Sequence, residues 1–152
     1  MIDQLDNKIL NALMINARTP YTELAKQFDV SPATIHVRIE KLRQQGVITG
    51  THIEVDPKSL GYDVCCFIGV KLTNAGDYPT VLDKLKAISA VTEAYYTTGQ
   101  YSILIKIMAQ SIDDLQWLLI DQIQCIEHIQ STETLISLQE GIHRNISLNV
   151  ER

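Results

Sequence analysis

The stretch SPATIHVRIEKLRQQGVITG, residues 31–50, has the signals of a short helix that stops abruptly and is followed by an extended segment. Ser31 is a favoured N-cap, and Pro32 fits the first helical position, where its missing N–H is not needed. Gly46 is a typical helix stop. Three aliphatic residues at helical spacing form one face: Ile35, Ile39 and Leu42. We therefore expect a helix within Ser31 to Gln45 that has an apolar back.

The other faces of this predicted helix are small, polar or basic. We expect the following residues to face outward: Ser31, Ala33, Thr34, His36, Val37, Arg38, Lys41 and Arg43. A helix that enters the DNA major groove needs small and polar residues near its N-terminus for base edges, and cations for phosphate. We assign base-edge or nearby backbone contacts to Thr34, His36 and Arg38, of which Arg38 can contact guanine bidentately. Lys41 and Arg43 lie further along, where phosphate is expected, although a merely solvated charged face is the competing interpretation.

Two further helical patterns precede this one. Apolar residues at three- and four-residue steps predict a helix over about Asp6 to Asn16, capped by Asp6: Leu5, Ile9, Leu10, Leu13 and Met14. A short second helix follows Thr19-Pro20 and has three inward positions: Leu24, Ala25 and Phe28. Only Phe28-Asp29-Val30 separate it from the helix at Ser31, which is too short a turn for two helices to lie side by side. A steep crossing, the helix-turn-helix arrangement, is therefore predicted.

The net charge does not argue against a nucleic-acid partner. The 152 residues carry a formal net charge of −5. Residues 1–64 hold 7 basic and 8 acidic side chains, whereas residues 65–152 hold 6 and 10, so most of the excess negative charge lies in the second part. A polyanion feels the local field within about 8 Å, the Debye length at physiological salt. A small basic helix can therefore work on an acidic protein.

Several classes of protein are disfavoured by the sequence. No apolar run reaches the length of about 18 residues that a membrane span needs, and the N-terminus does not resemble a secretory signal. We therefore expect a cytoplasmic protein with no membrane partner. The three cysteines give no disulfide framework: Cys65, Cys66 and Cys125. The four histidines fall at no metal-ligand spacing, and we expect no metal and no cofactor.

From about His52 the hydrophobic period changes to two. We interpret residues 55–64 as an extended linker between a helix-turn-helix domain at 1–54 and a second domain with a C-terminal tail at 65–152. The second domain has the order βαββαβ, with strands at 65–73, 91–98, 101–109 and 129–138 and helices at 78–89 and 111–126. We expect these helices to point the following residues inward: Val81, Leu82, Leu85 and Ile88, then Ile112, Leu115, Leu119, Ile123 and Ile126. This order is typical of an α+β, ferredoxin-like fold, with a two-residue turn at Gly99-Gln100 between the middle strands.

A ferredoxin-like sheet covers one face with both helices and leaves the other bare. Because residues 101–107 are apolar on both sides, the bare face predicts a partner sheet, most simply from a second copy related by twofold symmetry. A dimer would also present two reading helices at high effective concentration. Trp117, Leu118 and Ile120 add apolar surface that is either a broad core stripe or a second interface. The tail at 141–152 either pairs with a neighbouring edge or is loose.

The first 50 residues contain the segments LD, IL, AR, ELA, VS, TI and RI, and a βαββαβ domain that contains TTGQYS at 97–102 follows them. With these features the chain resembles the Lrp/AsnC family. The resemblance covers residues 2 to about 140. Within the family, EAYYTTGQYSI at 93–103 and the strand at 127–136 are most similar to the asparagine regulators. The resemblance implies a transcription regulator that binds double-stranded DNA, dimerises and assembles further, commonly to octamers, and responds to an amino acid.

The same resemblance implies an effector site between neighbouring dimers, at the TTGQYS turn and the final strand. Its candidate residues are Tyr96, Thr98, Gly99, Gln100, Tyr101, Ser102, Gln130, Ser131, Thr132 and Glu133. The chemistry suits an amino acid, because Gly99 lets backbone N–H groups approach a carboxylate and Glu133 can receive an ammonium group. Gln100 and Ser102 stand where many members are acidic. Since a neutral site suits a side-chain amide, asparagine is the expected effector.

Other interpretations stay open at this point. Taken alone, TTGQYS is an ordinary β-hairpin turn. An amino-acid sensor that acts through protein partners without DNA fits the second domain equally well. A small-molecule enzyme on the ferredoxin-like half is the third possibility, but the chain has no Cys-His or Ser-His pairing, no paired carboxylates and no phosphate-binding glycine loop. We therefore expect no enzyme activity.

Overall fold

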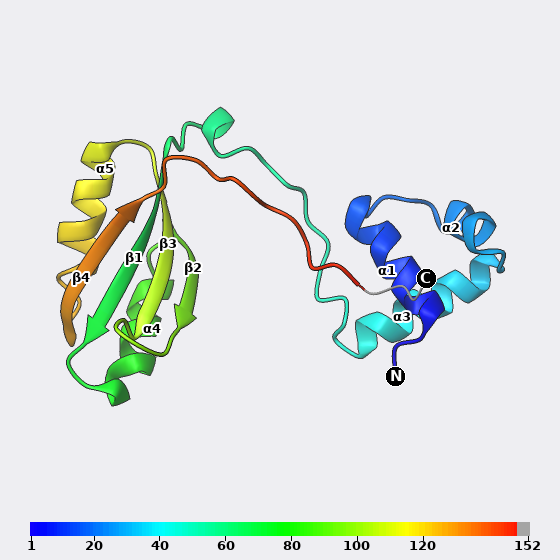
Figure 1. The fold of residues 1–152 in the computed structure, drawn as a ribbon, viewed down its shortest axis with the longest axis horizontal. Helices are drawn as coiled ribbons and strands as arrows, with labels where there is room; N and C mark the ends of the chain where they lie inside the picture. The colour runs from blue at the N-terminus through cyan, green and yellow to red at the C-terminus, as the bar shows by residue number, and fades with distance from the viewer. Residues whose placement is uncertain (149–152) are drawn as a thin grey trace. The chain divides into compact units, whose positions relative to one another are not determined.

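The computed structural model describes residues 1–148, which form two compact units (Figure 1). The first unit comprises Met1–Glu54 together with the tail from Ile142, and the second comprises Val55–Gly141. The tail at 142–148 thus groups with the helical unit, whereas the sequence interpretation had assigned it to the second domain. No helix in the described part of the chain is long and apolar enough to cross a membrane.

The first unit contains three helices, α1 (Gln4–Ile15), α2 (Tyr21–Phe28) and α3 (Pro32–Gln44). Its core confirms the predicted apolar faces and includes Ile9, Leu24, Ala25, Ile35 and Ile39. The turn between α2 and α3 closes on Asp29 in the left-handed conformation, with φ 55°, which aspartate tolerates better than most residues. Ser31 caps α3 as predicted, because its side-chain oxygen accepts a hydrogen bond from the Thr34 N–H at 3.1 Å.

The start of α1 corrects the sequence prediction. Asp3, and not Asp6, is the N-cap, and the two aspartates form a reciprocal capping box. The Asp6 N–H donates to Asp3 Oδ1 at 2.9 Å, and the Asp3 N–H donates to Asp6 Oδ2 at 3.0 Å. Asp6 therefore lies inside the helix, and it is only 2% exposed. The capping box satisfies the backbone N–H groups of Asp3 and Asp6 with side-chain oxygens.

The described tail lies against α1 within the same unit. The Asn145 side-chain amide donates to the Met14 carbonyl oxygen at 3.5 Å. His143 Nε2 lies 2.9 Å from Glu54 Oε1, so the tail also contacts the segment that follows the helices. The sequence left the arrangement of this tail open, and residues 149–152 lie outside the described chain.

The second unit is the predicted ferredoxin-like fold. Its elements are η1 (Lys58–Leu60), β1 (Val64–Leu72), η2 (Ala75–Asp77), α4 (Tyr78–Lys86), β2 (Val91–Tyr96), β3 (Ile103–Ala109), α5 (Ile112–Trp117), the π-helical continuation η3 (Leu118–Ile123) and β4 (Ile129–Ile136). The strands form one sheet in the order β2-β3-β1-β4, and every neighbouring pair is antiparallel.

Strict alternation along β3 fixes which sheet face is the core. Its buried residues are Ile103, Ile105, Ile107 and Ala109, and both helices pack on that face, through Val81 and Leu85 of α4 and Leu115 of α5. Ile112, predicted to point inward, is 57% exposed, whereas Leu118, which lay outside the predicted stripe, is 4% exposed. The reason is the π-helical turn, whose five-residue spacing brings Leu118 and Ile123 to the same side.

The connection between β2 and β3 is longer than predicted. β2 ends at Tyr96 and β3 begins at Ile103, so the two-residue turn at Gly99-Gln100 is replaced by a loop over 97–102. The Thr97 N–H donates to the Ser102 carbonyl oxygen at 3.0 Å, and the Ser102 N–H donates to the Val70 carbonyl oxygen at 2.9 Å. The loop therefore satisfies its backbone groups by bonding to β1 as well as to itself.

Candidate functional site

The outward face of α3 is free of the protein core over most of its length. Within this face Ser31, Ala33, His36, Lys41 and Arg43 are exposed, and Val37 is 64% exposed. An exposed aliphatic residue among small and polar neighbours suits contact with a thymine methyl group better than contact with water. The apolar back formed by Ile35, Ile39 and Leu42 is buried. The helix thus presents one coherent polar and basic surface.

Several of these side chains already have local partners. The Thr34 and Ser31 hydroxyls are 2.8 Å apart, the His36 ring lies 6.0 Å from the Tyr21 ring of α2, and Arg43 Nη1 donates to Glu40 Oε1 at 2.6 Å. Within residues 1–148 the structure records no hydrogen bond or ion pair of the Lys41 side chain, whereas its carbonyl oxygen accepts from the Gln45 N–H at 2.9 Å. An exposed ion pair within one helix contributes little and exchanges easily, so Arg43 stays available to a phosphate.

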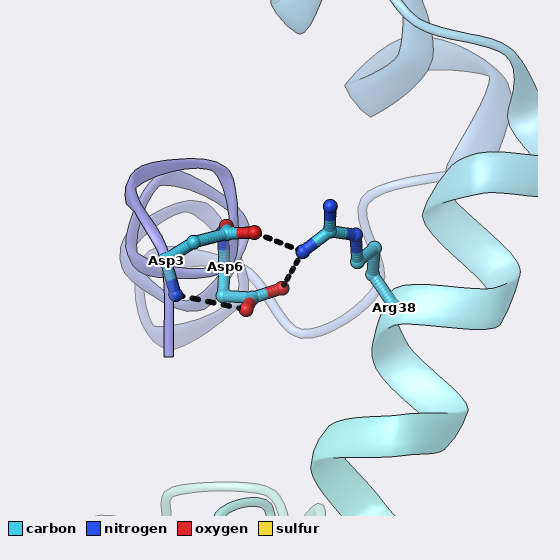
Figure 2. A network of polar contacts seen from close by, with 3 residues as sticks. All are labelled: Asp3, Asp6 and Arg38. Carbon is cyan, nitrogen blue, oxygen red and sulfur yellow. Dashed lines mark hydrogen bonds and ion pairs between the residues drawn. The ribbon is translucent and has the colours of Figure 1, made fainter. Parts of the chain in front are cut away.

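Arg38 has partners within the protein that the sequence did not predict. Its side chain is 30% exposed and turns toward α1 (Figure 2). Nη1 donates to Asp3 Oδ2 and, at 3.2 Å, to Asp6 Oδ1. The guanidinium predicted to read a base is therefore bound to the two carboxylates of the α1 capping box. The sequence offered no signal for this contact, because 32 and 35 residues separate the partners.

The contacts within this cluster favour the charged forms of Asp3 and Arg38. The Asp6 backbone N–H, followed by the Arg38 side chain, lowers the pKa of Asp3. The hydrogen bond to Asp3 raises the pKa of Arg38 above its usual value. Two carboxylates at the positive end of the α1 dipole face one cation. The cluster carries one net negative charge that the helix terminus offsets.

The second candidate site is the loop at 97–102 with the adjoining strand β4. Gly99 has φ 95°, which only glycine adopts readily. The Thr97 hydroxyl donates to the Tyr101 carbonyl oxygen at 2.8 Å. Thr98, Gly99 and Gln100 are exposed at the tip, and the Tyr96 ring lies 4.3 Å from the Tyr78 ring of α4. The loop is therefore held at its base and open at its tip.

Tyr101 and Glu133 are brought together, as candidates for one site must be. The Tyr101 hydroxyl donates to Glu133 Oε2, although the tyrosine precedes β3 and the glutamate lies on β4. The ring crosses Gly69 of β1, where an added Cβ would lie 2.6 Å from the ring carbon Cγ. Gly69 pairs with Glu133 across the strands. Sequence reasoning missed Gly69, and its signal was a lone glycine inside a strand pattern.

The other residues proposed on β4 do not all converge with these. Successive strand residues point to opposite faces, so Thr132 and Glu133 lie on different sides of the sheet. Thr132 faces the helices, where the Gln124 side-chain amide donates to its hydroxyl at 3.0 Å. Gln130 and Ser131 are exposed. Within one copy of residues 1–148 the candidate effector residues therefore form two groups, and no three His, Cys, Asp or Glu residues gather as metal ligands there.

Comparisons with known proteins agree with both parts. Residues 2–43 match the AsnC-type helix-turn-helix domain, and residues 65–146 match the Lrp/AsnC ligand binding domain. The regulatory protein AsnC of Escherichia coli K12 is 64% identical over 146 residues, which are 96% of each chain. The solved structure of E. coli AsnC has a TM-score of 0.94 and covers 97% of this chain and 99% of its own. A transcriptional regulator of Neisseria meningitidis, solved with L-Met, is 20% identical with a TM-score of 0.91, covers 99% of this chain and 97% of its own, and supports the fold alone.

Proposed function

Because the chain belongs to the Lrp/AsnC family of DNA-binding transcription regulators, we propose that it recognises duplex DNA through α3 and that an amino acid, most simply asparagine, controls this binding. The observation that carries the DNA part is the exposed face of α3 over a buried apolar back. We propose that the following residues face the duplex: Ser31, Ala33, Thr34, His36, Val37, Lys41 and Arg43. The N-terminal members are suited to base edges, and Lys41 and Arg43 to phosphate.

The salt dependence of DNA binding tests the phosphate assignment. We expect Lys41→Ala to weaken binding to a duplex selected by the wild-type protein and to a shuffled duplex by the same factor. The slope of log affinity against log salt should fall by about one for each helix in contact with DNA. Fluorescence anisotropy over a salt series measures both quantities. Lys84→Ala on α4 removes a lysine of the other unit that is also exposed and serves as the matched control. A loss confined to the selected duplex would contradict the phosphate role.

The effector proposal is supported by the chemistry of the loop and of Glu133. The exposed tip at Thr98, Gly99 and Gln100 offers backbone N–H groups to a carboxylate. Glu133 offers a carboxylate for an ammonium group, in exchange for its bond to Tyr101. Gln100 and Ser102 add neutral polar groups that suit an amide. Asparagine is thus favoured over amino acids with apolar or charged side chains.

Titration calorimetry with asparagine, glutamine, aspartate, leucine and methionine tests this choice. We expect asparagine to bind most tightly and Glu133→Gln to weaken it at least tenfold, because the ammonium group loses its charged partner. Gln139→Ala, on an exposed residue beyond β4, is the control. Tighter binding of another amino acid would refute asparagine while leaving the effector site standing.

We further propose that the chain acts in the cytoplasm as a homodimer that assembles to larger oligomers such as octamers. The support is the sheet face opposite the helices, where Phe67 is 36% and Leu135 is 54% exposed and where Leu104 and Met108 are half-buried. A second copy of the same sheet would cover this face. The three cysteines are free thiols, as in a reducing compartment.

Two other functions have less support. An amino-acid sensor without DNA binding leaves the exposed basic face of α3 unexplained. An enzyme is disfavoured because the relatives of this chain are named as regulatory proteins. Retention of wild-type protein on duplex DNA at moderate salt separates the proposed function from the sensor.

A further inference from the structure

We infer that Arg38 is a positioning residue, which holds the reading helix α3 against the first turn of α1 and does not act as a base-reading group. The inference rests on the proposed function of α3. The observation behind the inference does not depend on that function, because it is the contact of Arg38 with Asp3 and Asp6 (Figure 2).

The burial of Asp6 is the first step. Within residues 1–148, Asp6 is the one charged residue that is buried, with an exposure of 2%. A buried carboxylate is costly unless it is both hydrogen-bonded and paired with a cation. The Asp3 N–H binds one oxygen of Asp6 and Arg38 Nη1 binds the other, at 3.0 and 3.2 Å. Arg38 therefore supplies the charge that makes the burial of Asp6 tolerable.

The position of Arg38 on α3 is the second step. It directly precedes Ile39, which is buried in the core beside Ile9 of α1, so its side chain starts at the edge where α3 meets α1. Arg38 Nη1 crosses this edge to both carboxylates, so the first turn of α1 can pack against α3 without an uncompensated buried charge. The apolar core shared by the two helices then sets the angle at which α3 is presented.

Competition for the guanidinium is the third step. If Arg38 turned outward to a base, Asp6 would remain buried with no cation. Removing one partner of a buried pair is strongly destabilising, whereas removing both is close to neutral. Binding of Arg38 to DNA would therefore be opposed by the helical unit itself. Arg38 contributes to recognition through the placement of its neighbours on α3.

A rescue experiment separates positioning from base reading. The four proteins are wild type, Arg38→Met, Asp6→Asn and the double variant, each as the full chain. The probes are a duplex selected from a random pool by the wild type and a shuffled duplex of equal composition. Fluorescence anisotropy gives the affinity and the selected-to-shuffled ratio, and urea unfolding gives the stability of each protein.

We expect Arg38→Met to lower affinity for the selected duplex at least tenfold and to lower the selected-to-shuffled ratio. Asp6→Asn should keep the capping bond and change affinity less than threefold. The double variant, which has no guanidinium but also no buried charge, should recover stability and come within about threefold of wild-type affinity and ratio. If Arg38 read a base, the double variant would still lack that contact, and its affinity and ratio would not recover.

Recovered stability with affinity still at the Arg38→Met level would overturn the inference and restore Arg38 to base reading. If Arg38→Met does not fold, the double variant and Asp6→Asn decide alone, since they differ only at Arg38. If the wild-type protein selected no duplex from the random pool, that result would refute the proposed function. It is distinct from a rescue that fails.

Discussion

Tyr101 reaches Glu133 because Gly69 leaves the space between them empty. The ring lies directly over the glycine backbone, and the hydroxyl bridges from the loop before β3 to the far strand β4. One side chain thus joins the loop to two strands on the open sheet face, β1 and β4. The loop that we propose for the effector and the sheet face that we propose for the dimer therefore share a residue.

Gly69→Ala tests this bridge. An added Cβ would lie 2.6 Å from the ring, so the ring must move and release Glu133. We expect a loss of about 1–3 kcal/mol in the free energy of unfolding, as for other overpacked sites, together with weaker asparagine binding. Urea unfolding and calorimetry measure the two effects. Tyr101→Phe keeps the ring and removes the hydroxyl, so it should change effector binding more than stability. A Gly69→Ala protein as stable as wild type would mean that the ring relocates freely.

At the scale of single residues, sequence reasoning succeeded where a residue acts on its near neighbours. The cap at Ser31 is such a local effect, and its signal is visible within four residues. Arg38 shows the limit. An arginine on an amphipathic helix looks the same whether it faces DNA or a carboxylate 32 residues earlier, because periodicity gives the face of a helix but not the partner of a long side chain.

At the scale of elements, hydrophobic periodicity and turn residues placed α1 to α5 and the four strands of the described chain to within a few residues, with η3 counted as part of α5. The short helices η1 and η2 were not predicted, and η1 lies in the stretch expected to be an extended linker. Where the structure differs from the sequence prediction, the cause is a local change in backbone geometry. The π-helical turn at Leu118–Ile123 rotates the buried stripe of the last helix. The loop at 97–102 binds β1 through the Ser102 N–H. Neither a π-turn nor a bond to a third strand leaves a mark in hydrophobic spacing.

The cap of α3 gives a prediction at this scale. We expect Ser31→Ala to lower the free energy of unfolding of the helical unit by about 1 kcal/mol, because the Thr34 N–H loses its acceptor. Far-UV circular dichroism during urea unfolding measures the loss. Ser31→Asn should retain most of the stability, since asparagine is also a good cap. Equal stability of the alanine and wild-type proteins would show that the cap contributes nothing.

At the scale of the whole molecule, the sheet face opposite the helices is the subunit interface that we propose. Phe67 lies at its centre, paired with Lys106 on one side and Leu135 on the other. We expect Phe67→Glu to convert a dimer or larger assembly to monomers, because two buried carboxylates would face each other across the twofold axis. Light scattering after size-exclusion chromatography measures the mass. Ile112→Glu, at an exposed position of α5, is the control. An unchanged mass for Phe67→Glu would place the subunit interface elsewhere.

The order of the strands also has a consequence for synthesis on the ribosome. The three helices contact one another within the first 50 residues and can form early, since local contacts close quickly. Strand β1, by contrast, lies between β3 and β4, and β4 ends at Ile136. One edge of β1 thus stays unpaired until more than 60 further residues have been made. During that interval the incomplete sheets of neighbouring nascent chains can pair wrongly through this edge. Chaperone protection would act at that stage of synthesis.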